Sequence, residues 1–331
     1  MKVPESIIWI ITARCNLNCL HCYTRRFLGG RELSTDEVLK LIREASELGV
    51  EYIQFTGGEP LLRKDALNLI REALNYGIDV SLFTNATLVS SGVARELSKL
   101  GVTVFTSIDG PNRGIHELVR GRGTWDRVVN GIKALVSEGI DLHINISISR
   151  LNWRYVGDTI RKAVELGANS VSVIPVMPSG SALSNRVYVG SDEVTYALRK
   201  AEEVAKELGI VVSAWCTPFA YLIVSPKYVS SHNCRDWDVM DIAPTGDILL
   251  CDILDIKLGN VTELGIREGW RRLMSSELMK EIINPKLNPP CTTCPISNLC
   301  RGGCYARAIK IFGSIKSPDP LCPLVKEIRQ Y

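Results

Sequence analysis

Short apolar runs and longer amphipathic segments alternate along the first two thirds of the chain. Apolar, β-branched runs that predict strands occupy residues 7–12, 50–55, 78–83, 102–108, 141–148 and 169–174. Apolar residues at helical spacing predict helices near 35–48, 65–76, 90–99, 124–138, 153–166 and 191–208. Six consecutive βα units predict a parallel sheet, either an open doubly wound sheet or a curved, incomplete (β/α) barrel.

Polar, glycine-rich or cysteine-rich segments follow the predicted strands. They include "ARCNLNCLHCYT" (13–24), "FTGGEP" (55–60), "FTNAT" (83–87) and "TSIDG" (106–110). Parallel α/β folds bind their ligands at the carboxyl ends of the strands. We therefore expect these segments to share one rim and to form a binding site there.

The pattern changes near residue 210, where helical periodicity fades and cysteines recur. The segment 241–254, "DIAPTGDILLCDIL", predicts a β-hairpin that turns at Thr245–Gly246. The sequence therefore predicts two domains, residues 1–210 and residues 211–331. We expect the second to be rich in loops and to be held together by something other than apolar burial.

Composition narrows the class of protein. The 331 residues are 46% hydrophobic and 23% charged, which describes a soluble globular chain. The apolar run at 7–11 is too short for a membrane span, so we expect a cytoplasmic protein with no membrane partner. In a reducing cytosol, eleven cysteines favour metal or cluster ligation over disulfides. A net charge of +3 without a block of basic residues excludes a nucleic-acid arm.

The first cysteines have the spacing C-x3-C-x2-C, at Cys15, Cys19 and Cys22. A [4Fe–4S] cluster has four irons, so three thiolates from one loop leave one iron to a ligand from outside the protein. A zinc site is the alternative, but zinc requires a fourth Cys or His. His21 is directly adjacent to Cys22, and adjacent residues rarely bind the same metal.

The combination of "CNLNCLHC" after the first strand with "GGEP" after the second resembles the radical S-adenosylmethionine enzymes. The resemblance implies a partial (β/α)6 TIM-like barrel whose cluster binds S-adenosylmethionine at the open iron. One electron from the cluster would cleave this cofactor into methionine and a 5′-deoxyadenosyl radical. The radical would then remove a hydrogen atom from an unreactive C–H bond.

The resemblance and the positions at the strand ends imply six residues for S-adenosylmethionine binding: Tyr23, Gly57, Gly58, Glu59, Asn85 and Ser107. The glycines would let the backbone approach the methionyl ammonium, and the glutamate would bond to it. The asparagine and the serine would bind ribose hydroxyls or the carboxylate, and the tyrosine would lie near adenine. The alternative roles are turn glycines, loop caps and a core aromatic residue.

The later cysteines resemble the seven-cysteine signature of the SPASM domain, which follows radical S-adenosylmethionine barrels. The resemblance implies two auxiliary [4Fe–4S] clusters, and hence three clusters in all. One would be held by Cys291, Cys294, Cys300 and Cys322. The other would be held by Cys234, Cys251 and Cys304. The remaining cysteine, Cys216, is the expected fourth ligand of the second; the alternatives are a buried structural thiol or an open auxiliary iron.

Enzymes with this architecture mostly modify peptides or proteins, and we expect such a substrate. The alternative is oxidation of iron-porphyrin side chains in haem synthesis. A non-catalytic iron–sulfur electron carrier is disfavoured, because it has no need of "GGEP". Asp252 follows Cys251 as in sulfatase-maturing enzymes, so it is a candidate catalytic base, although it could simply cap the hairpin. The expected electron donor is a ferredoxin or a flavodoxin.

Overall fold

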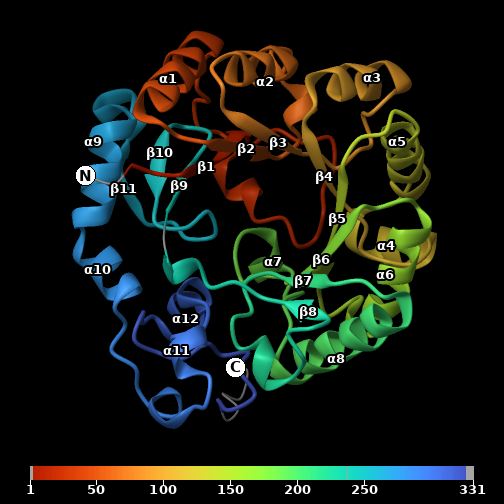
Figure 1. Ribbon diagram of the computed structural model, residues 1–331, viewed down its shortest axis with the longest axis vertical. Coiled ribbons are helices and arrows are strands. Elements are labelled where there is room, and N and C mark those ends of the chain that lie inside the picture. Colours follow the sequence, from red (N-terminus) through yellow and green to blue (C-terminus); the bar gives the residue numbers. More distant parts are fainter. Residues whose placement is uncertain (1–2, 237, 326–331) are drawn as a thin grey trace.

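The computed structural model describes residues 3–236 and 238–325, which form a curved sheet with helices on its outer face (Figure 1). The six predicted strands are all present, and each is parallel to its neighbours. They are β1 (Ser6–Thr12), β2 (Tyr52–Gly57), β3 (Asp79–Phe83), β4 (Thr103–Ser107), β5 (Leu142–Ile148) and β6 (Ser170–Pro175). The sequence-based expectation of a partial (β/α) barrel is therefore confirmed.

The predicted crossover helices lie outside this sheet. They are α1 (Thr35–Leu48), α2 (Ala66–Asn75), α3 (Ser91–Leu100), α5 (Trp125–Ser137), α6 (Val156–Glu165) and α8 (Ser191–Leu208). Two shorter helices, α4 (Arg113–Arg120) and α7 (Ser181–Ser184), lie in the loops after β4 and β6. Ser34 and Glu37 form a capping box at the start of α1, and Gly49 ends the helix at φ 85°.

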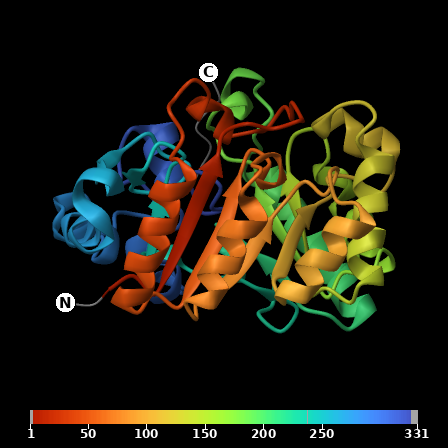
Figure 2. The same cartoon turned by 90° about the horizontal axis from the view of Figure 1, so that it is seen from above.

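Successive side chains along each strand point alternately to the face beneath the helices and to the inner face of the sheet. Leu82, Val104 and Ile144 point outward and are completely buried. The residues between them, such as Phe105 and Ser107, are partly exposed on the inner face. The inner face is therefore the one available to ligands, and Figure 2 shows the parallel strands rising together toward one rim.

The sheet continues beyond the barrel at both edges, in the order β11-β10-β9-β1-β2-β3-β4-β5-β6-β7-β8. At one edge are β7 (Val212–Ala214) and β8 (Val229–Ser230). At the other are β9 (Val239–Ile242), β10 (Asp247–Leu249) and β11 (Lys257–Asn260). The pairing of β9 with β10 confirms the predicted hairpin, and Gly246 turns it at φ 83°. The division at residues 210 and 211 stays a prediction, because β7 pairs directly with β6.

The C-terminal part also contains α9 (Val261–Ser275), α10 (Glu277–Ile283), α11 (Ser297–Cys300) and α12 (Tyr305–Phe312). In Figure 1 these helices occupy the side that the barrel helices leave open. The expectation that this part lacks apolar burial is wrong for α9. Ile266, Trp270 and Leu273 lie on one face of that helix and join the core of the barrel.

The remaining elements are short 3-10 turns at Thr24–Phe27, Pro60–Leu62, Trp153–Tyr155, Ala220–Leu222, Cys234–Asp236 and Cys291–Thr293. Among the described residues, no helix combines the length and the apolar character needed to cross a membrane.

Candidate functional site

The loop that carries Cys15, Cys19 and Cys22 leaves the carboxyl end of β1 and is attached to three neighbouring segments. At its start, the backbone N–H of Ala13 donates to Glu32 Oε1 at 2.8 Å. In its middle, the N–H of Leu20 donates to the carbonyl of Val119 at 3.0 Å. At its end, the N–H of Ser181 donates to the carbonyl of Cys22 at 2.9 Å. These bonds hold three thiols together on one short loop.

The three cysteines are partly exposed. Burial raises the pKa of the Cys19 thiol to about 12, and the nearby Arg120 guanidinium opposes this rise. Burial also raises the pKa of Cys15. A thiol ligates metal as the thiolate, so metal binding at this loop must displace protons from thiols that otherwise keep them.

The predicted glycine pair packs directly against the start of the cysteine loop. The N–H of Gly58 donates to the carbonyl of Thr12 at 2.7 Å. A Cβ atom on Gly57 would lie 2.5 Å from the carbonyl oxygen of Thr12, and one on Gly58 would lie 2.3 Å from that of Arg14. The glycines are therefore needed for a close approach of two backbones. Their predicted role near the methionyl ammonium stays a prediction.

Glu59 is completely buried, and its carboxylate accepts hydrogen bonds from protein groups. Oε1 accepts from the hydroxyl of Thr84 at 2.8 Å and from the N–H of Leu61 at 3.0 Å. Oε2 accepts from the N–H of Asn85 at 2.7 Å. Burial raises the pKa of this carboxyl to about 7, although the three hydrogen bonds lower it. A carboxylate oxygen can accept two bonds, so Oε2 keeps acceptor capacity for a further donor.

Three further predicted cofactor residues have different surroundings. The side-chain amide of Asn85 donates to Asn16 at 3.0 Å and to the sulfur of Cys15 at 3.7 Å. Ser107 ends β4 and is partly exposed on the inner face. Tyr23 hydrogen-bonds Asp252, so its ring faces the C-terminal part. The predicted roles of these side chains toward ribose, carboxylate and adenine stay predictions.

Arg120 lies beside the first cysteine loop, although it is not among the residues that the sequence predicts for the site. It is buried at the end of α4, and its Nε donates to Asp109 Oδ2 at 2.6 Å. Asp109 is held in turn by the N–H of Ser147 at 2.8 Å. The ion pair places a permanent cation beside Cys19, where a thiolate would need one. The sequence does place Asp109 and Arg120 after the fourth strand, where site residues are expected. Only the packing of α4 shows that the two side chains are in contact.

Four C-terminal cysteines line one surface hollow. They are Cys291, Cys294, Cys300 and Cys322, which is the set expected for one auxiliary cluster. Burial raises the thiol pKa of Cys300 to about 12 and that of Cys322 to about 11, and the charges of Asp319 and of the neighbouring cysteines add to both rises. Asp319 also lines the hollow. Four thiols in one place are a donor set that fits an iron–sulfur cluster.

The remaining cysteines form a second group. Burial raises the thiol pKa of Cys216, Cys234 and Cys251, and the charge of Cys304 adds to each rise. At Cys251 the carboxylates of Asp252 and Asp241 contribute more than Cys304 does. Cys216 therefore lies among the thiols that it was expected to join, despite its distance in sequence. Its backbone has φ 55°, a left-handed conformation that is uncommon outside glycine. Its ligation of a cluster stays a prediction.

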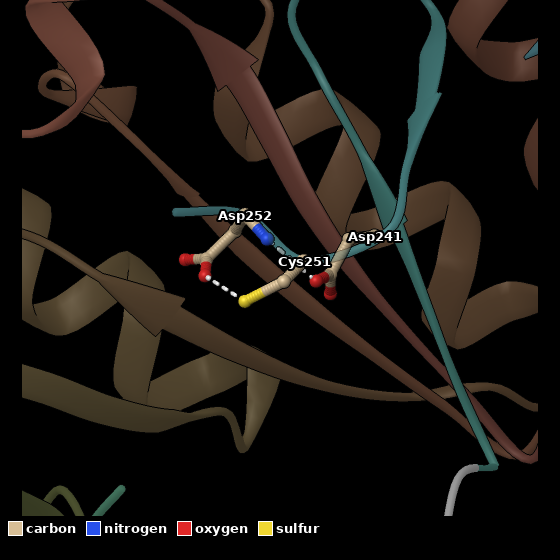
Figure 3. Close-up of side chains that lie close together, drawn as sticks. All are labelled: Asp241, Cys251 and Asp252. Carbon is tan, nitrogen blue, oxygen red and sulfur yellow. Dashed lines mark hydrogen bonds between the residues drawn. The ribbon is translucent and has the colours of Figure 1, made fainter. Parts of the chain in front are cut away.

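Asp252 lies next to this second group and beside another carboxylate, as Figure 3 shows. The ligand atoms of Asp241, Cys251 and Asp252 all lie within 4.8 Å of one another. Asp252 donates its N–H to Asp241 Oδ2 at 2.8 Å and accepts from the Cys251 thiol at 3.6 Å. Burial raises the pKa of both carboxyls, and Tyr23 and Arg26 lower that of Asp252. The hydrogen bond from Tyr23 connects the loop of the first cysteines to the auxiliary group.

Comparison with known proteins agrees with this arrangement. Residues 9–163 match the model of the radical SAM superfamily, and residues 234–295 match SPASM, an iron–sulfur cluster-binding domain. The AdoMet-dependent heme synthase of Methanosarcina barkeri is 30% identical, with 97% of each chain covered. The PqqA peptide cyclase of Bradyrhizobium diazoefficiens is 29% identical, with 97% of this chain and 87% of that one covered. A solved structure of native anSMEcpe with bound AdoMet has a TM-score of 0.76 at 21% identity, covering 97% of this chain and 94% of that one. At that identity, the last comparison shows the fold.

Proposed function

The chain belongs to the radical S-adenosylmethionine superfamily and carries a C-terminal SPASM domain, and from this premise we propose a specific site and substrate. The cluster that cleaves S-adenosylmethionine is held by Cys15, Cys19 and Cys22. When bound, this [4Fe–4S] cluster supplies the electron that converts the cofactor to methionine and a 5′-deoxyadenosyl radical, which takes a hydrogen atom from the substrate. The observation that carries the proposal is the packing of Gly57 and Gly58 against the cysteine loop, which joins the two motifs in one place.

The chain's own residues prepare this site for a charged cofactor. Glu59 is anchored by three protein donors and retains capacity on Oε2 for the methionyl ammonium. Asn85 and Ser107 stand at the ends of adjacent strands, where they can bind the carboxylate or the ribose. Arg120 provides positive charge beside Cys19. Tyr23 borders the adenine end of the proposed cofactor site, because it follows the cysteine loop and hydrogen-bonds Asp252.

Two auxiliary [4Fe–4S] clusters complete the proposed cofactor set. Seven cysteines follow the SPASM signature, and Cys216 supplies the eighth thiolate. The second group supports this assignment, because Cys216, Cys234 and Cys251 all interact with Cys304. Since such clusters and free thiols persist in a reducing compartment, we place the protein in the cytoplasm, with a ferredoxin or a flavodoxin as its electron donor.

For the substrate, we propose an iron porphyrin, which an aromatic cluster on the inner face of the sheet and a curated relative support. Phe83, Phe105 and His143 are register neighbours on β3, β4 and β5. Their ring centroids lie 4.4 and 4.6 Å apart, and Trp215 stacks on His143 at 5.4 Å. These rings pack on one another, and the partly exposed Phe83, Phe105 and Trp215 give the inner face an aromatic, apolar lining for a flat molecule. The 30% identity to a heme synthase over nearly all of both chains supports the same substrate.

A peptide is the second candidate, which the sequence by itself favours. The 29% identity to a PqqA peptide cyclase supports it. So does Asp252, a buried carboxylate between the first cysteine loop and the auxiliary group that could take a proton from a peptide side chain. With a peptide substrate, Asp252→Asn should abolish product. Unchanged product would exclude the proposed base.

The first experiment is to measure iron and sulfide in protein reconstituted without oxygen, where three clusters correspond to about twelve irons per chain. S-adenosylmethionine cleavage is then followed as methionine and 5′-deoxyadenosine formation. An iron porphyrin with propionate side chains and short cysteine- or tyrosine-containing peptides are offered separately, and products are identified by mass. Phe105→Leu should weaken porphyrin binding about fivefold to tenfold, the scale of one aromatic contact. Absence of cofactor cleavage in cluster-loaded protein would reject the proposed function.

A further inference from the structure

One buried arginine of the C-terminal part differs from the other buried arginines in its partners. Within residues 3–236 and 238–325, four arginines are less than a tenth exposed: Arg63, Arg120, Arg235 and Arg307. Three of them form ion pairs with aspartates at 2.6 to 2.7 Å. Arg235 is the exception, since it is 1% exposed and has no ion pair in this described part of the chain. Arginine stays charged even when it is buried, so a positive charge is enclosed there without an acidic partner.

Backbone carbonyl groups hold the guanidinium of Arg235 in place. Its Nε donates to the carbonyl of Gly303 at 3.3 Å, and its Nη1 donates to the carbonyl of Ile282 at 3.1 Å. Its Cζ also lies 5.6 Å from the centroid of the Tyr305 ring, within the range of a cation–π contact. These contacts are made with neutral groups, so they orient the guanidinium and leave its charge uncompensated. A buried charge of this kind is costly unless an anion lies close to it.

The guanidinium lies against the segment that joins the two auxiliary groups of cysteines. Residues 300–304 run from Cys300, in the group around the hollow, to Cys304, in the second group. Besides the bond to Gly303, the arginine approaches the neighbouring glycine, because a Cβ atom on Gly302 would lie 3.7 Å from Nη2. The positive charge is therefore placed between the two sets of thiols.

The charge of Arg235 acts on one thiol of each auxiliary group. Cys234, of the second group, directly precedes the arginine in the chain. Cys291, of the other group, lines the same surface hollow as the arginine. Burial raises the thiol pKa of both cysteines, and the charge of Arg235 lowers it in each case. One side chain is therefore electrostatically connected to both proposed cluster sites.

Resting on the proposed cofactor set, we propose that Arg235 is the shared counter-ion of the two auxiliary clusters and raises the reduction potential of both. A [4Fe–4S] cluster held by four thiolates has a net negative charge, which increases by one when the cluster accepts an electron. A buried cation stabilises the more negative state more strongly, so reduction becomes more favourable. The electron comes from a one-electron reductant, which is oxidised, and no proton or bond changes. The first cluster has its own arginine, Arg120, beside Cys19.

The test compares the reduction potentials of the cluster-loaded wild type and three variants. Arg235→Met removes the charge, and Arg235→Lys keeps it. The control is Arg267→Met on α9, where the arginine is exposed and forms no ion pair in the described part of the chain. Iron is measured first, and each protein is then titrated with dithionite and redox mediators while electron paramagnetic resonance follows the reduced clusters. The signal of the first cluster is identified by its absence from a variant in which Cys15, Cys19 and Cys22 are alanine.

In Arg235→Met we expect the equilibrium constant of one-electron reduction to fall at least about tenfold at both auxiliary clusters, which corresponds to a potential about 59 mV lower. Arg235→Lys should stay within about threefold of the wild type, because it keeps a positive charge. The first cluster should be unchanged in every variant, and all clusters should be unchanged in Arg267→Met. Unchanged auxiliary potentials in an iron-loaded Arg235→Met, or a fall at only one of the two clusters, would overturn the proposal. An equal fall in Arg235→Lys would also overturn it, because packing and not charge would then matter.

Arg235→Lys decides the question if Arg235→Met takes up no auxiliary iron. Full iron and near-normal potentials in the lysine variant would then support the need for a cation, whereas loss of auxiliary iron there too would overturn it.

The same measurements separate this inference from the proposed function. Wild-type protein with about four irons per chain would lack the auxiliary clusters, which overturns the proposed cofactor set and the counter-ion together. With about twelve irons and unchanged potentials in Arg235→Met, only the counter-ion role is wrong. If wild-type protein with three clusters never cleaves S-adenosylmethionine, the proposed function fails, while lowered auxiliary potentials in Arg235→Met still support the counter-ion.

Discussion

Nη1 of Arg307 donates to both carboxylate oxygens of Asp319, at 2.8 and 2.7 Å, in a site where both side chains are at most 2% exposed. The pair also holds two cysteines of the second auxiliary group. Asp319 Oδ2 accepts from the N–H of Cys304 at 2.9 Å, and Arg307 Nη2 donates to the carbonyl of Cys216 at 3.0 Å. Asp319 lines the hollow of the other auxiliary group. One ion pair therefore positions backbone at one proposed cluster and borders the other.

Removing one partner of this pair should be strongly destabilising. Asp319→Ala leaves a buried guanidinium without its counter-ion, a change that costs about 3–5 kcal/mol in other proteins. In a chain of this size we expect the melting temperature of the cluster-loaded protein to fall by about 10 °C. Calorimetry measures this fall, and an iron assay shows whether auxiliary iron is lost with it.

The matched control is Glu203→Ala, which removes the partner of Lys200 in an exposed pair at 2.6 Å. Exposed pairs contribute little, so the control should melt within about 2 °C of the wild type. If Asp319→Ala has the same melting temperature as the control variant, the buried pair does not stabilise the fold.

Gly58→Ala should disable the first cluster without unfolding the barrel. The added methyl group would lie 2.3 Å from the carbonyl oxygen of Arg14, in the loop that leads to Cys15. Backbone has to move to relieve such a contact, so the loop is displaced. Iron analysis should show a loss of about four irons per chain, which is one cluster.

Gly92→Ala is the control for this substitution. In α3, the nearest atom to an added Cβ is the hydroxyl oxygen of Ser90 at 3.7 Å, so the methyl group fits. We expect full iron content and a stability equal to or slightly above the wild type, since alanine favours helices. Equal iron content in both variants would show that the close approach at Gly58 is not required.

Cys216→Gly tests the fourth auxiliary ligand. Glycine removes the thiol and adopts the φ of 55° without strain. Any effect of the substitution therefore comes from loss of the side chain and not from a strained backbone. If Cys216 ligates iron, the variant changes the electron paramagnetic resonance signal of one auxiliary cluster, or loses it. An unchanged spectrum with about twelve irons would show a buried thiol instead.

Limited proteolysis of iron-free protein should cut within residues 284–323 and spare α9. The cysteines around the hollow at Cys291 and Cys322 lose the clusters that hold their loops together. By contrast, Trp270 and Leu273 attach α9 to the core of the barrel through apolar burial, which does not depend on iron. Mapping the fragments by mass identifies the cut sites. Cleavage within α9, or equal resistance of iron-free and iron-loaded protein in 284–323, would contradict this expectation.

Local sequence determined the parts of this protein whose physical causes are local. Apolar periodicity and capping residues are properties of neighbouring positions, so the six βα units were predictable, as was the hairpin at Gly246. The spacing of Cys15, Cys19 and Cys22 likewise depends on one short loop. Because parallel strands end at one rim, the proximity of these cysteines to Gly58 followed from the fold class.

Tertiary structure decided the features whose partners are distant in the chain. The parallel pairing of β9 with β1 and the burial of Trp270 against the barrel depend on surfaces that local periodicity does not describe. The contact of Arg120 with Asp109 beside Cys19 depends on how α4 packs after β4. The placement of Cys216 near Cys304 depends on the path of the chain after β7. Long-range packing is set by the sum of many weak contacts, so no single stretch of sequence shows these features.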